Sequence, residues 1–200
     1  MKKLLPTVLS IFALFVISGF AQTAYNDNEA YQVYAALLPA EWTVKEAKAK
    51  KLVIVGETSD FRSFAREKKE SICLVPAEGE ESIYAPVLKN YVDVNKTKWT
   101  LQRKFPDGIS YELVPSLDID AIFKTKGIEG WKDFYAKYPD SGGSITLSAV
   151  GFNADKTFAI AYVGHSCGGL CGGGRYHVLK KADGKWTEIS WKGQSCSWAS

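Results

Sequence analysis

Hydrophobic and polar positions follow two periods along this chain, and the period changes near residue 140. In the first half, apolar residues recur every three or four positions in two segments, which is typical of helices that bury one face. The first segment follows Asn28, a residue type that often caps helices, and Pro39 is predicted to end it. The second covers residues 80–94, with Pro86 near its start. Both segments are predicted to be amphipathic helices.

Shorter patterns lie between and after these helices. Leu52–Val55 and Tyr111–Val114 are compact runs that predict strands, the second ended by Pro115. Ranges 61–70 and 99–105 fit neither period. A third helix is predicted over Ile128–Tyr138, and its aromatic side chains are expected in the core because such stripes usually serve packing: Trp131, Phe134, Tyr135 and Tyr138.

The last third of the chain has the alternation of strands. Four are predicted, at residues 144–152, 157–165, 174–181 and 185–191, with turn residues at 153–156 and 183–184. Short connections join antiparallel neighbours. The predicted fold class is therefore α+β, with helices packed on one face of a C-terminal antiparallel β-meander of about four strands.

The N-terminal residues have the pattern of a secretory signal peptide. Lys2 and Lys3 precede an apolar core, and Gly19 and Ala21 supply the small residues of a cleavage site. We expect residues 1–21 to be removed, so that a single α+β domain over residues 22–200 begins at Gln22 and acts in the periplasm or outside the cell. No later stretch is apolar enough to predict a membrane span.

Charge argues against nucleic acid as a partner. The whole sequence has a formal charge of +3, which becomes +1 when residues 1–21 leave with two lysines and no acid. Nucleic-acid binding needs a strong local excess of Lys and Arg along one face. Hydrolase and phosphate-binding motifs are also missing from the sequence, and Asp118-x-Asp120 is a lone acidic pair rather than a metal motif. No cofactor is predicted.

A set of glycines, aromatic residues and cysteines extends over about the last 75 residues: Gly130-Trp131, Phe134-Tyr135, Tyr138-Pro139, Leu147-Ser148, Val150–Asn153, Ala159–Val163, Cys167, Cys171-Gly172 and Gly184–Trp186. At these positions the chain resembles an uncharacterised group of exported bacterial proteins. The resemblance implies a bacterial exported protein, but it brings no activity with it.

The four cysteines are predicted to form disulfides because the chain is expected to enter an oxidising compartment. Three pairings are open, and we favour Cys167–Cys171 together with Cys73–Cys196. The first would close the glycine-rich segment 168–174, whose glycines we attribute to conformational freedom. The second would tie the C-terminal tail to the first half of the chain.

The segment around the first pair also carries both histidines of the sequence. With the two thiols, His165 and His177 offer the four ligand types of a tetrahedral zinc site, although oxidation competes with metal binding. Together with Arg175 they define a candidate ligand site. We interpret the protein as a non-catalytic, disulfide-stabilised exported domain that binds a ligand or protein partner. An enzyme with a site near His165 and His177, zinc binding and thiol redox chemistry remain the alternatives.

Overall fold

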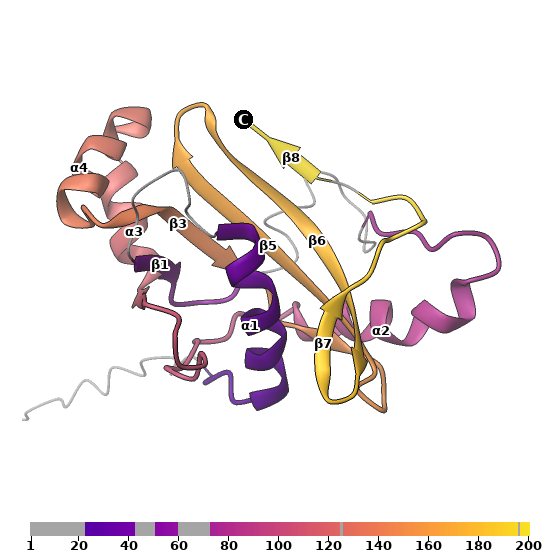
Figure 1. Ribbon diagram of the computed structural model, residues 1–200. Coiled ribbons are helices and arrows are strands. Elements are labelled where there is room, and N and C mark those ends of the chain that lie inside the picture. The colour runs from indigo at the N-terminus through magenta and orange to yellow at the C-terminus, as the bar shows by residue number, and fades with distance from the viewer. Residues whose placement is uncertain (1–22, 43–50, 60–72, 125, 196) are drawn as a thin grey trace, which may run out of the picture.

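The computed structural model describes residues 23–42, 51–59, 73–124, 126–195 and 197–200 (Figure 1). The signal peptide predicted over residues 1–21, the ambiguous range 61–70 and Cys196 lie outside this description. The described elements, in chain order, are α1 (Asn28–Trp42), β1 (Lys51–Val55), α2 (Glu81–Val94), β2 (Tyr111–Val114), α3 (Ser116–Phe123), the 3-10 helix η2 (Gly127–Glu129), α4 (Gly130–Lys137), β3 (Ser141–Leu147), β4 (Gly151–Phe152), β5 (Phe158–Gly168), β6 (Cys171–Ala182), β7 (Lys185–Glu188) and β8 (Ser197–Ala199).

The described strands form one mixed sheet of eight strands, so the α+β class is confirmed. Its main path runs β2-β1-β3-β5-β6-β7, with β4 paired to β5 and β8 paired to β6. Strand β1 is parallel to both β2 and β3, whereas all other pairs are antiparallel. The sheet therefore extends into the first half of the chain instead of being limited to a C-terminal unit.

Helices cover both faces of this sheet, which corrects the prediction of a single helical face. Helix α1 packs on one face, against Ile54, Ala159 and Leu179 among others. The opposite face carries α2, packed on Ile160 and Val178, and the α3–α4 pair beside β1 (Figure 1). The reason lies in the strands, because β5 is apolar at successive positions and has two hydrophobic faces to bury.

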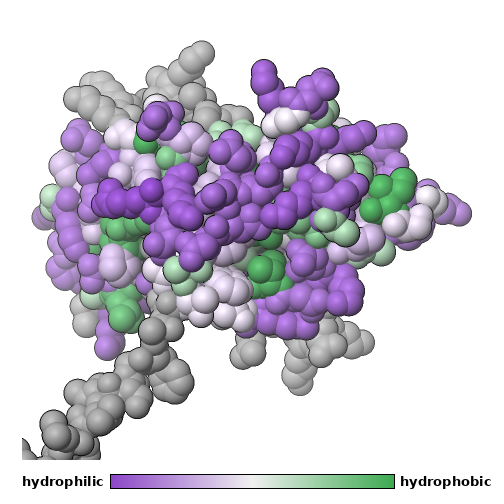
Figure 2. Space-filling view, turned by 90° about the horizontal axis from the view of Figure 1, so that it is seen from below, coloured by the Kyte–Doolittle hydropathy of each residue, from purple (hydrophilic) through white to green (hydrophobic). Residues whose placement is uncertain are grey.

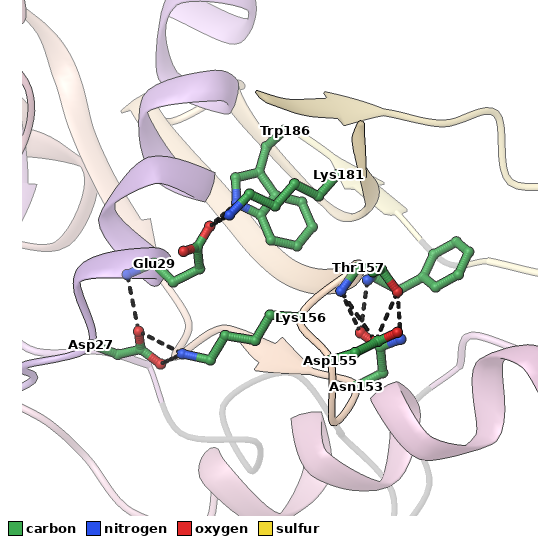
Figure 3. Close-up of polar contacts among 9 residues, drawn as sticks. Asp27, Glu29, Asn153, Asp155, Lys156, Thr157, Lys181 and Trp186 are labelled. Carbon is green, nitrogen blue, oxygen red and sulfur yellow. Dashed lines mark hydrogen bonds and ion pairs between the residues drawn. The ribbon is translucent and has the colours of Figure 1, made fainter. Parts of the chain in front are cut away.

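Polar contacts fix the start of α1 to the sheet (Figure 3). The Asp27 carboxylate accepts a hydrogen bond from the Glu29 amide at 3.0 Å and pairs with Lys156. Glu29 in turn accepts hydrogen bonds from Lys181 Nζ and Trp186 Nε1, each at 2.6 Å. Asp27 rather than Asn28 is thus the capping residue. Helix α1 also continues past Pro39 to Trp42, where the prediction had ended it.

The glycine-rich segment belongs largely to strands, contrary to the loop prediction. Strands β5 and β6 extend to Gly168 and Cys171, so only residues 169–170 connect them. Gly172–Gly174 have no positive φ, so the backbone conformation does not require glycine there. Their missing side chains instead leave room for neighbouring groups. A Cβ at Gly174 would lie 2.0 Å from the Tyr162 hydroxyl and 2.5 Å from Trp198 Nε1, two groups hydrogen-bonded to each other across β6. The glycines therefore let side chains cross the strand at backbone level.

Helix α3 was missed in the sequence, and the third predicted helix is shorter than expected. Ser116 begins α3 directly after Pro115, and its amide donates to the Glu57 carboxylate at 2.7 Å. Three residues of α3 pack against the sheet or α4. The helix was missed because its apolar pattern is too short to be distinguished from the flanking segments of the sequence. The predicted strand 144–152 is also divided into β3 and β4. Helix α3, η2 and α4 together border the site described below.

Candidate functional site

The two cysteines of the glycine-rich segment form a disulfide. Cys167 lies at the register shift between Ser166 and Gly168 near the end of β5, and Cys171 begins β6. The two Cα atoms lie 5.0 Å apart. Cys73 is also disulfide-bonded, while Cys196 lies outside the described residues. Val75, two residues after Cys73, pairs with Gln194 in an antiparallel bridge. This bridge agrees with the Cys73–Cys196 pairing, which stays a prediction.

The predicted ligand residues His165, Arg175 and His177 line neither of the two cavities found among the described residues. Arg175 and His177 both contact the Glu188 carboxylate, at 2.9 and 3.0 Å. His165 lies on the neighbouring strand, and its Nε2 makes a 2.7 Å hydrogen bond with the Gly142 carbonyl oxygen of β3. Burial lowers the pKa of His165, partly offset by that hydrogen bond. The three side chains share the α1 face of the sheet, but His165 is engaged with β3 and the other two with β7.

The disulfide hairpin lies against α4 and η2 at the opposite face. The Tyr135 hydroxyl of α4 donates a hydrogen bond to the Cys167 carbonyl oxygen at 2.8 Å. One residue beyond the strand end, a Cβ at Gly169 would lie 2.8 Å from Cγ2 of Ile128, so the chain contacts η2 closely. Ile128 is 72% exposed and Leu170 is 91% exposed. These contacts make the hairpin tip one border of a hollow.

That hollow is a cavity of about 590 Å³ between the sheet and helices α3 and α4. Its volume falls within the range of small-molecule pockets, roughly 300–1,000 Å³. It lies where β1 and β2 end and the chain turns into the helical segment. The side chains and backbone that line it come from three sources: the sheet (Val55, Ser144, Thr146, Ser166, Gly168, Gly169), α3 (Ser116, Ile119, Asp120, Phe123), and η2 with α4 (Gly127, Ile128, Trp131).

Three hydroxyl-bearing residues form the sheet side of the cavity. Ser144 and Ser166 are direct cross-strand partners on β3 and β5, and Thr146 lies two residues along β3 on the same face. None of the three side chains makes a hydrogen bond with the part of the chain that the structure describes. Ser144 is only 7% exposed, yet its Oγ is not sealed from solvent. Hydroxyls held in a largely buried place without a partner are costly unless a ligand or water satisfies them.

The helical side of the cavity combines one carboxylate with aromatic rings. Asp120 is the one charged side chain among its described lining residues, and no described residue forms an ion pair with it. Trp131 is half-buried, with its ring centroid 4.9 Å from that of Phe123. The aromatic stripe of α4 is therefore divided, because Phe134 and Tyr138 are buried as predicted whereas Trp131 borders the cavity.

A second cavity, of about 750 Å³, lies between residues 24–27, α2 and the β4–β5 turn. Its polar groups are already engaged. Lys156 pairs with Asp27, Lys89 with Asp93, and the Asn90 side-chain oxygen accepts from the Phe152 amide. The polar side chains without a hydrogen-bond partner therefore distinguish the first cavity.

In the view from below, hydrophilic residues cover most of the described surface, and apolar residues form small separate groups (Figure 2). The described residues of this face therefore present no extended apolar patch.

The described residues contain neither a cluster of metal ligands nor a membrane-spanning helix. Across residues 23–42, 51–59, 73–124, 126–195 and 197–200, no three His, Cys, Asp or Glu side chains are grouped as ligands for a metal ion. In the oxidised hairpin, neither Cys167 nor Cys171 is a thiolate ligand for the zinc alternative. Asp118 is exposed and does not line the cavity that Asp120 borders. None of the helices within these ranges is long and apolar enough to cross a membrane.

Comparison with protein-family models, curated protein sequences and solved structures found no match to this chain. The functional interpretation of the cavity is therefore based on its geometry. Sequence reasoning missed Ser144, Thr146 and Ser166, since serine and threonine are common in exposed strands. It set Asp120 aside as part of a lone acidic pair with Asp118. The available signal was the alternation of polar residues 144 and 146 with apolar residues 145 and 147 in a strand whose neighbours are apolar on both faces.

Proposed function

We propose that this protein is a non-catalytic exported domain that binds a small polar ligand in the cavity between β3, β5 and helices α3 and α4. The observation that carries the proposal is the set of polar side chains in the cavity wall that have no partner. Ser144, Thr146, Ser166 and Asp120 meet there around a volume of about 590 Å³. Such convergent polar groups in a cleft with an aromatic wall are typical of ligand sites.

A binding role is favoured over catalysis by the position of the histidines. Neither His165 nor His177 lines either cavity, and both are engaged on the α1 face of the sheet. Proton transfer requires the acid or base within hydrogen-bond reach of the reacting group. Serine hydroxyls without a neighbouring base are weak nucleophiles, and among the described wall residues Asp120 is the one carboxylate, with no histidine beside it.

The disulfide has a direct part in this proposal. It closes the β5–β6 hairpin whose tip, through Gly168 and Gly169, forms the border of the cavity. A cross-link of this kind restricts the hairpin and prepares the site for its ligand before binding. Export to an oxidising compartment, with a mature chain beginning at Gln22, agrees with a disulfide used in this way. Intact-mass measurement of the secreted protein tests that start.

Ligand capacity is tested by NMR with a library of small polar fragments. We expect fragments to shift the amide signals of residues around the cavity. Thr146→Leu fills the cavity and should abolish these shifts, whereas Thr187→Leu places the same change on the exposed part of β7 and should leave them intact. Both variants are first checked for folding by their spectra. Fragments that bind elsewhere only, or binding that survives Thr146→Leu, would refute the proposal.

A further inference from the structure

The chemistry of the cavity wall also defines a class of ligand, an inference that rests on the function proposed above. We infer that the site binds a hexosamine-type saccharide, a pyranose ring that carries several hydroxyls and one protonated amine. Three properties of the wall carry this inference: the arrangement of its hydroxyls, its aromatic side, and its charge.

The hydroxyls match those of a sugar in both spacing and chemistry. Ser144 and Ser166 are cross-strand neighbours, with Thr146 on the same face of β3. Cross-strand neighbours have Cβ atoms about 4.5–5.5 Å apart, and same-face neighbours on a strand are separated by two rises of roughly 3.3 Å. The three groups thus span an area the size of one sugar ring. Each hydroxyl both donates and accepts, as sugar hydroxyls do.

The aromatic side of the cavity gives the pyranose ring of the ligand a surface on which its C–H groups can pack. Trp131 and Phe123 line the cavity from α4 and α3, and Ile128 extends the apolar border to the exposed rim. A pyranose has polar edges and an apolar face, so it satisfies hydroxyls on one side while it packs on aromatic rings on the other. A ligand that is polar on all sides would leave this wall unmatched.

Charge separates an amino sugar from other sugars. Asp120 is the one charged side chain among the described residues of the wall, and no described cation pairs with it. The Asp120 carboxylate is itself exposed at the border of the cavity, where it disfavours an anionic ligand and favours a cation that can hydrogen-bond to it. A bare quaternary ammonium ion would suit the aromatic rings and Asp120, but it would leave all three hydroxyls unsatisfied.

The test is a calorimetric and NMR titration of the exported protein with four probes. D-Glucosamine should bind at the cavity about ten-fold tighter than D-glucose, since a charge-assisted hydrogen bond is roughly twice as strong as a neutral one. D-Glucuronate and tetramethylammonium should show no binding there. Tighter binding of glucuronate or tetramethylammonium than of glucosamine, or equal binding of glucosamine and glucose, would overturn the inference.

Variants identify the residues that act. Asp120→Asn should reduce glucosamine affinity to that of glucose and leave glucose affinity unchanged. Asp118→Asn is the matched control, because it removes an exposed carboxylate two residues earlier on the same helix and should change neither. Ser144→Ala should weaken both sugars about five-fold through one lost hydrogen bond. Equal effects of the two aspartate variants would overturn the role given to Asp120.

Failure of this inference is distinguishable from failure of the proposed function. If the fragment library binds at the cavity but glucosamine does not, the site is a ligand site for another class and the saccharide assignment is wrong. If neither binds at the cavity, both proposals are refuted.

Discussion

The Tyr135 hydroxyl donates a hydrogen bond to the Cys167 carbonyl oxygen at 2.8 Å, joining α4 to the disulfide hairpin. The two residues are 32 positions apart in sequence, and each is close along the chain to residues that line the cavity: Trp131 on α4, and Ser166 and Gly168 on β5. The bond fixes the hairpin at its cysteine, while the disulfide fixes the hairpin to itself. Helix and cross-link therefore act together on the border of the candidate site.

Tyr135→Phe should loosen this border. Loss of one hydrogen bond is expected to reduce the free energy of unfolding by about 1 kcal/mol and to speed amide exchange at residues 166–172. Tyr84→Phe is the control, because the Tyr84 ring packs on Trp191 while its hydroxyl makes no hydrogen bond with the described residues. Unchanged exchange at the hairpin in Tyr135→Phe would show that the contact does not hold it.

Removal of the Cys167–Cys171 cross-link should cost about 2 kcal/mol, as the chain-entropy relation gives for so short a loop. Cys167→Ser, Cys171→Ser and the double variant should unfold at similar denaturant concentrations, because all three remove one bond. Peptide mapping of the native protein should recover the linked pair. Two reactive thiols at these positions in the native protein would contradict the structure and restore the zinc and redox alternatives.

Gly143→Ala should destabilise the protein by more than about 2 kcal/mol. Gly143 has φ +115°, and a Cβ there would lie 2.2 Å from the Ser166 carbonyl oxygen and 2.9 Å from the Cys167 Cα, both backbone atoms. Gly184→Ala is matched in its positive φ, +75°, but meets nothing within 4 Å. It should cost only the backbone strain, roughly 1 kcal/mol. Similar losses in chemical denaturation of the two variants would refute the steric argument.

The interactions of the Glu29 carboxylate predict that the free energy of unfolding decreases in acid. Hydrogen bonds from Lys181 and Trp186, together with the Lys181 charge, hold the Glu29 pKa below its ordinary 4.5 despite desolvation. Because the folded-state pKa is lower than the unfolded one, this stabilisation is complete above pH 4.5 and disappears as the pH falls through the folded-state value.

Glu29→Gln should therefore be about 0.5–1 kcal/mol less stable than the parent at pH 7 and should approach it as the pH falls below 4.5. Trp186 keeps its acceptor in this variant, so the charge is the part removed. Lys181→Met should produce the same convergence from the other side of the ion pair. Denaturation curves measured from pH 3 to pH 7 test this expectation. A difference in the free energy of unfolding between parent and variant that stays constant across that range would exclude the ion pair as its source.

Local patterns were sufficient for much of the fold. The periods of α1, α2 and α4 and the runs of β1 and β2 appear in the sequence because each element buries its own apolar residues. Short-range geometry also allowed the Cys167–Cys171 bond to be predicted, since four residues of glycine-rich chain readily bring two cysteines together. Helix α3 escaped because eight residues give too little periodicity for recognition.

The sequence by itself determined the α+β class, most element types and the closed hairpin, because those depend on neighbours along the chain. Tertiary structure alone decided that β1 joins β2 and β3 in parallel, that helices cover both faces, and that Ser144, Ser166 and Asp120 meet at one cavity. These residues come from two strands and a helix. Their meeting depends on strand register, because a shift of one residue in either strand would turn its serine to the other face.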